Sequence, residues 1–401
     1  MNERFLLLTS LLLFHSIFVY LDDGSGIGRI IQAMSTVALI ALLLVKRKYK
    51  LLPQFKTINR LVVIYCIGLF VISYLSKDIN MNSLDSLRLG NKEDLRLSSY
   101  TLGILQALSV LTSFIYIEYL SSINKTEILF RTFYKVSLFY IIISDLVFLV
   151  IGSIGEQGYL IGNKFSLCYM HILCYVFYYI YSYKRNVIPN KCISIMLIIM
   201  TLLMSILAEC TTTLLGMLVI VFLFNTKRRF GFILFKLKTY VIILSLGVLF
   251  IFFYSFILDI QIVQDFIVNI LHEDITLNGR TEIYDALIPI LSVRPLWGVG
   301  VGNSHWVLAY LLGVANAQNG LVNLYIEEGL TCTVLYLLIF ISVFKYVKDK
   351  IAHSFSYPLL CYILFFFIVG LVEITIDNKL LVVISFLIAY DYNKYNHICQ
   401  K

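Results

Sequence analysis

Long hydrophobic runs follow one another along almost the whole chain. Many have about the 20 residues that a helix needs to cross the ~30 Å hydrocarbon core of a bilayer, and their apolar residues are not spaced as the narrow stripes of amphipathic helices. The pattern predicts about 12 transmembrane helices, near residues 4–21, 28–45, 60–76, 99–122, 128–151, 166–183, 188–208, 211–225, 237–258, 321–344, 354–371 and 380–392. We therefore expect an all-α, polytopic integral membrane protein, with residues 1–401 in a single transmembrane domain.

Composition and charge agree with this interpretation. The chain is 60% hydrophobic and 14% charged, whereas a soluble domain carries roughly a quarter of its residues charged. If the N-terminus is cytoplasmic, 23 of the 32 Lys and Arg residues fall at cytoplasmic helix ends, as the positive-inside rule requires. The net charge of +8 is therefore interpreted as a topology signal that places both termini in the cytoplasm, and we expect no nucleic-acid partner.

The segment 259–320 is the longest expected connection and is predicted to be a large periplasmic loop. Apolar residues at helical spacing predict a helix near 281–292 that lies on the membrane surface. Arg280 precedes that helix, where a fixed cation and free backbone N–H groups favour an anion. Further along, Arg294 is followed by Gly298 and Gly300, and glycines let a backbone approach a ligand closely.

The next predicted helix opens with polar residues. Asn319, Asn323, Glu327 and Thr331 are four residues apart, so they should share one helix face. Polar groups on a spanning helix are costly unless they face protein or a water-filled cavity. The face therefore either packs through interhelical hydrogen bonds or, as we prefer, lines a cavity open to the outer surface. Asp145, in the middle of the fifth predicted span, also needs a partner.

These motifs together resemble the bacterial O-antigen polymerase and O-antigen ligase superfamily. The elements that carry the resemblance are Gly279-Arg280 with Tyr284, Pro295 with Gly298 and Gly300, Ala317 with Asn319, and Glu327 with Gly329. Two departures stand out. Gln318 occupies the position of the family's histidine, and Cys210-Thr211-Thr212-Thr213 stands where the family often has Ser-Arg. Because ligases keep the histidine more uniformly, the resemblance favours a polymerase.

The resemblance implies a metal-independent glycosyltransferase without a cofactor. It would join oligosaccharide repeat units carried on undecaprenyl diphosphate, at the outer face of the bacterial inner membrane. The bilayer and a chain-length regulator protein are the other implied partners. Arg280 and Arg294 would hold the diphosphate, because a guanidinium stays charged and matches phosphate oxygens. Glu327 would be the base, with His305 as the alternative. The implied substrate-binding residues are Arg294, Tyr284, Gly298, Gly300, Gln318, Asn319 and Asn323.

Two alternatives remain open at this point. An O-antigen ligase would transfer the glycan to lipid A core with similar residues. A lipid-linked sugar flippase or other transporter belongs to a different class, and such proteins often use broken helices near the middle of the membrane. No proline of this chain lies at the centre of a predicted span, and the polar motifs gather in one outer segment, so we favour the transfer enzyme.

Overall fold

The structure is a computed structural model, and it describes residues 3–18, 27–45, 53–76, 101–152, 160–234, 236–266, 269, 280–314, 316–348 and 355–389. All regular secondary structure within these ranges is helical. Six of the described helices are long and apolar enough to cross a membrane. They are α2 (Ile27–Val45), α3 (Lys56–Leu75), α4 (Thr101–Ser122), α5 (Thr126–Ile151), α6 (Lys164–Lys184) and α15 (Gly320–Lys348).

Further helices complete the described part of the chain. The apolar ones are α1 (Glu3–Ile17), α7 (Lys191–Leu207), α8 (Thr211–Asn225), α10 (Leu237–Leu258), α16 (Ser356–Val369) and α17 (Asn378–Ser385). The others are η1 (Pro53–Phe55), α9 (Lys227–Leu234), α11 (Gln261–Phe266), α12 (Arg280–Asp285), α13 (Leu287–Val293), α14 (Ser304–Leu312) and η5 (Phe386–Ile388). Capping residues define several starts: Asn163, Asn190 and Asp377 each accept a backbone N–H at the beginning of α6, α7 and α17.

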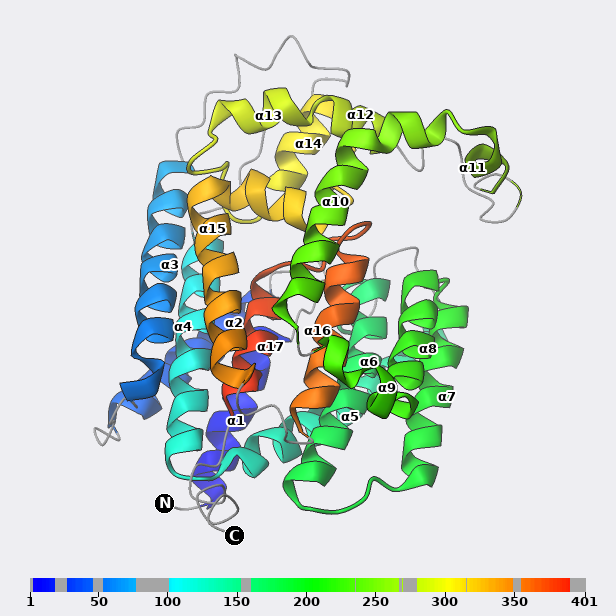
Figure 1. The fold of residues 1–401 in the computed structure, drawn as a ribbon. Coiled ribbons are helices and arrows are strands. Elements are labelled where there is room, and N and C mark those ends of the chain that lie inside the picture. The colour runs from blue at the N-terminus through cyan, green and yellow to red at the C-terminus, as the bar shows by residue number, and fades with distance from the viewer. Residues whose placement is uncertain are drawn as a thin grey trace.

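The helices pack as one bundle whose outer faces are apolar. Helix α15 lies along α3, while α17 is in the interior, against α4, α15 and α16 (Figure 1). Large apolar side chains such as Met34, Ile67 and Leu146 are exposed on outward faces. By contrast, buried polar side chains pair between helices, as where the Tyr116 hydroxyl lies 2.7 Å from Thr9 Oγ1. Apolar outside and polar contacts inside are compatible with a protein that is embedded in lipid.

The first and last described helices approach the same end of the bundle. Glu3 at the start of α1 pairs with Arg131 of α5 at 3.2 Å. At this end, Ser121 of α4 donates to the carbonyl of Ile388, and the Lys184 ammonium of α6 donates to the carbonyl of Ala389. Helices α11 to α14, which belong to the segment 259–320, lie at the opposite end (Figure 1).

The structure differs from the expected helices at three places. The single helix expected near 281–292 is two short helices, α12 and α13, on either side of Ala286. Helix α15 is also interrupted, because Gly329 has φ 65° and ψ 179°, far from helical values. Thr331 lies beyond this break, so it does not continue the face of Asn323 and Glu327. The predicted span 380–392 begins with a short buried helix, α17, followed by η5, and residues 390–392 lie outside the described ranges.

Candidate functional site

The break in α15 is joined to the segment after α13 by backbone hydrogen bonds. The N–H groups of Val299 and Gly300 donate to the carbonyls of Ile326 and Glu327 at 2.8 and 2.9 Å. On the other side of the break, the N–H groups of Leu330 and Thr331 donate to the carbonyls of Pro295 and Leu296 at 2.8 and 3.2 Å. The backbone groups that the break would leave unpaired are thus satisfied by residues 295–300.

Two glycines make this contact sterically possible. Gly298 and Gly329 both have φ of +65°, a conformation that side chains with a Cβ rarely adopt. A Cβ on Gly329 would lie 2.5 Å from the nitrogen of Gly298, and one on Gly298 would lie 2.5 Å from the carbonyl oxygen of Glu327. The two backbones therefore touch, and the pair Gly298 and Gly329 sets the position of Glu327.

Glu327 is held by groups of the neighbouring loop and helix. The Ser304 hydroxyl at the start of α14 donates to Glu327 Oε1 at 2.6 Å, and the backbone of Gly302 and the side chain of Asn323 also hydrogen bond with this carboxyl group. Asn323 is buried, and its Oδ1 has no hydrogen-bond partner within the described part of the chain. His305 is exposed and its ring lies 5.2 Å from that of Trp306. The Glu327 carboxyl is therefore in contact with Asn323 of its own helix and with Gly302 and Ser304 of the preceding segment. His305 is the residue that follows Ser304.

The predicted diphosphate ligands lie near the same end of the bundle. Arg280 is the first residue of α12, and its side chain lies outside what the structure describes. Tyr284 is buried, with its ring edge-on to Tyr254 at 5.0 Å. Arg294 Nη1 donates to the carbonyl of Leu75, at the end of α3, at 2.6 Å. Arg294 and Leu75 also line a cavity of about 330 Å³, whose other lining residues are Pro295, Leu296 and Trp297.

Asn319 and Gln318 take part in the start of α15. Asn319 Oδ1 accepts the N–H groups of Leu321 and Val322, and its Nδ2 donates to the carbonyl of Leu371 at 3.0 Å. Gln318 has φ of 46°, and its backbone N–H donates to Asn316 Oδ1. The Asn319 side chain is thus engaged with backbone groups that begin α15 and tie it to the connection between α16 and α17. A substrate contact by Gln318 or Asn319 stays a prediction.

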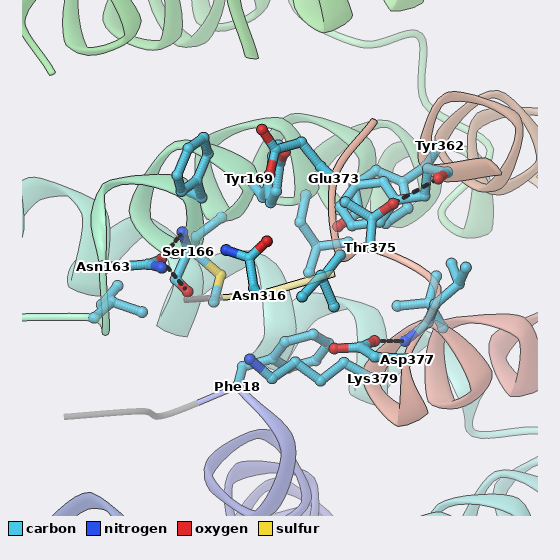
Figure 2. A pocket seen from close by; sticks show the side chains of 18 residues that line it. Phe18, Asn163, Ser166, Tyr169, Asn316, Tyr362, Glu373, Thr375, Asp377 and Lys379 are labelled. Atoms are coloured by element: carbon cyan, nitrogen blue, oxygen red, sulfur yellow. Dashed lines mark hydrogen bonds between the residues drawn. The ribbon is translucent and has the colours of Figure 1, made fainter. Parts of the chain in front are cut away.

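A larger cavity lies beside this helix start. Its volume is about 340 Å³, and it is lined by residues of α6, of the loop before α15 and of the segment 373–383 (Figure 2). Glu373, Asp377, Lys379 and Asn316 bring polar groups to its walls. A second cavity of about 160 Å³, between α1, α2, α4 and α17, shares Asp377 and Lys379 with it. Sequence reasoning missed these residues, because a charged stretch between two apolar runs is usually an exposed loop.

Asp377 has a structural function in this cavity wall. Its Oδ1 accepts the backbone N–H of Leu380 at 2.9 Å and caps α17 (Figure 2). Burial raises the pKa of the Asp377 carboxyl, while the Lys379 ammonium and backbone N–H groups lower it. Asp377 is also close enough to Glu327 for the two carboxyl groups to interact electrostatically. The cavity and the broken helix are therefore parts of one region.

A buried polar network includes Glu328, the residue that follows Glu327 in α15. The carboxyl group of Glu328 is 2.8 Å from the Tyr65 hydroxyl and 3.1 Å from Asn378 Nδ2. Asn378 Nδ2 also donates to Gln106 Oε1 at 2.6 Å, so the network joins α3, α4, α15 and α17. The hydrogen bonds compensate the cost of burying Glu328, and they fix α17 against the helix that carries Glu327.

The carboxyl group of Asp145, on the apolar helix α5, has a partner in the structure. Asp145 Oδ1 lies 3.0 Å from Nε2 of His171 on α6. The expected need for a partner is thus met by a residue that the sequence did not identify. In the described part of the chain, no three His, Cys, Asp or Glu side chains gather closely enough to hold a metal ion.

Comparison with known proteins adds no relative to this picture. No protein-family model matches the sequence, and no curated protein is significantly similar to it.

Proposed function

We propose that this chain is a surface-polysaccharide polymerase that joins oligosaccharide repeat units carried on undecaprenyl diphosphate. The observation that carries the proposal is the hydrogen-bonded contact between residues 295–300 and the break in α15. This contact links the segment with Arg294 to the helix with Glu327. It supports a site in which an arginine and a carboxylate act on one substrate. Asp377, which interacts electrostatically with Glu327, lines a cavity of about 340 Å³.

The proposed topology has twelve transmembrane helices, both termini in the cytoplasm and the segment 259–320 at the outer face of the inner membrane. It is supported by the distribution of Lys and Arg. The position of α11 to α14 at the end opposite to the start of α1 is consistent with it.

The proposed reaction needs charge stabilisation and one proton transfer. The hydroxyl oxygen of the acceptor sugar forms a bond to the anomeric carbon of the donor glycan, and the bond from that carbon to the diphosphate oxygen breaks. The acceptor proton goes to Glu327. The diphosphate leaves with the additional negative charge, which Arg280 and Arg294 stabilise. Ser304 and Asn323 hold the Glu327 carboxyl in place.

Deletion of the gene and electrophoresis of the surface polysaccharide test this function. Loss of a polymerase leaves single repeat units attached to lipid A core. Loss of an O-antigen ligase, the closest alternative, leaves bare core and polymer on the carrier. An unchanged ladder of polymer lengths would contradict both.

The break in α15 also favours a second candidate, a flippase for lipid-linked sugars, because broken helices are frequent in transporters. The break is level with the end of α3, however, since a Cβ on Gly300 would lie 2.6 Å from the Cβ of Ser76. Transporter sites of this kind lie near the membrane midplane. In a strain without the gene, carrier-linked repeat units on the cytoplasmic face would identify a flippase, whereas the same units on the outer face would identify a transfer enzyme.

A further inference from the structure

The cavity of Figure 2 is connected by hydrogen bonds to the start of α15, the helix that is broken at Gly329. Asn316, on its wall, lies three residues before Asn319, which caps α15 and donates to the carbonyl of Leu371. The N–H of Gly320 donates to the carbonyl of Gly370 at 2.8 Å. The connection between α16 and α17, which carries Glu373, is therefore tied to the helix that carries Glu327. Asp377, which also lines the cavity, is close enough to Glu327 for the two carboxyl groups to interact electrostatically.

The charge of the cavity lining is unfavourable for the diphosphate of the proposed substrate. Among the described lining residues, Glu373 and Asp377 are acidic and Lys379 is basic, so the lining carries one more negative than positive charge. A diphosphate carries several negative charges and requires cationic partners. The diphosphate is therefore unsuited to this cavity and suited to the arginine side of the site.

The chemical character of the lining matches a sugar ring. One wall is aromatic: the ring of Phe366 lies 4.3 Å from that of Tyr362 and 5.1 Å from that of Tyr169. Polar groups complete the lining: Figure 2 shows the carboxyl group of Glu373, the amide of Asn316 and the side chain of Lys379 among them. Aromatic rings cover the apolar face of a sugar, while carboxylates and amides accept hydrogen bonds from its hydroxyl groups.

We propose that this cavity binds a neutral or amino sugar of the acceptor glycan, with Glu373 as a hydrogen-bond acceptor for its hydroxyl or amino groups. The inference rests on the proposed function. It places the binding of the sugar and the binding of the diphosphate at different positions. The sugar is held between α6 and the segment 373–379, and the diphosphate is held on the side of Arg280 and Arg294. Glu327 is linked to both sides: its carboxyl group interacts electrostatically with Asp377 of the cavity, and its carbonyl accepts the N–H of Gly300 in the segment that follows Arg294.

Calorimetric binding to the purified full-length protein in detergent tests the proposal. The probe is the single repeat-unit oligosaccharide, released by mild acid from the polyprenyl lipids of the same bacterium, so it carries neither lipid nor diphosphate. It should bind the wild-type protein and the Arg280→Ala variant equally. Glu373→Gln should weaken binding by about tenfold or more, because a charge-assisted hydrogen bond is lost. The matched control is Glu209→Gln, since Glu209 is exposed at the turn before α8, and it should bind like the wild type.

Three results would overturn the inference: no binding to the wild type, unchanged binding by Glu373→Gln, or displacement of the glycan by inorganic pyrophosphate. If Glu373→Gln fails to fold, Glu373→Cys gives a second measurement. Its labelling by a bulky maleimide, counted by mass spectrometry at position 373, should be slowed by the glycan, and unslowed labelling would refute the cavity site. These assays measure binding without transfer, so an unchanged polymer ladder after gene deletion would refute the proposed function separately.

Discussion

Replacing Gly329 by alanine tests whether the break in α15 is held by its contact with residues 295–300. The backbone of Gly329, with φ 65° and ψ 179°, lies in a region that only glycine adopts readily, and another residue there costs about 1–3 kcal/mol. The new Cβ would also lie 2.5 Å from the nitrogen of Gly298 and from the carbonyl of Leu296. These atoms are backbone, so they cannot move aside as a flexible side chain would.

Relief of this clash would separate the two segments. Four backbone hydrogen bonds of 2.8 to 3.2 Å cross the contact, and each contributes about 1 kcal/mol. If two of them are lost together with the conformational cost, Gly329→Ala should destabilise the protein by about 3–5 kcal/mol. The carbonyl of Glu327 accepts the backbone N–H of Gly300, so Glu327 would move when this hydrogen bond is lost. We therefore expect polymer formation to be lost even in protein that still folds.

The matched control is Gly313→Ala. Gly313 ends α14 with φ of +69°, and a Cβ there would meet nothing within 4 Å. Its substitution should cost only the left-handed conformation, about 1–2 kcal/mol. The apparent melting temperature in detergent and the polymer ladder are measured for both variants. Equal stability of the two variants, or a normal ladder from Gly329→Ala, would refute the role of the contact.

Three other predictions address the mechanism and the topology. Arg280→Ala should abolish polymer at unchanged protein level and Arg280→Lys should restore little of it, because an ammonium lacks the bidentate fork; full activity of the lysine variant would mean that charge alone suffices. Glu327→Gln should lower the rate by roughly 10² or more while His305→Asn stays mild, and the reverse result would move the base to α14. A cysteine at the exposed position Ile262 should react with an impermeant reagent from the periplasm, whereas native Cys192, exposed at the start of α7, should not; the opposite labelling would invert the proposed topology.

The helical elements were predictable because they depend on local properties. A span expected over 128–151 is α5 (Thr126–Ile151), and one expected over 166–183 is α6 (Lys164–Lys184). Hydropathy and the length of an apolar run are properties of consecutive residues, so helices of this kind can be predicted without knowledge of the fold. Gly298 and Gly300 were expected to let the backbone approach a ligand, which stays a prediction. In the structure the backbone of these glycines contacts the backbone of α15.

Contacts between distant segments were not predictable in this way. The partner of Asp145 is His171 on another helix, and the buried Glu328 meets Tyr65 of α3. Neither pairing can be predicted from the spacing of residues along the sequence. Glu373 and Lys379 follow an apolar run in the sequence, and they line the cavity because the connection between α16 and α17 is tied to the start of α15.

The sequence by itself determined that this chain consists largely of apolar helices, because the length of an apolar run is a local quantity. Only the tertiary structure decided that α15 breaks at Gly329 and that Glu327 lies near Asp377 of a polar cavity. The physical reason is that a break in a helix is stable only where its unpaired backbone groups find partners. Here these partners are Pro295 to Gly300, about thirty residues earlier in the chain.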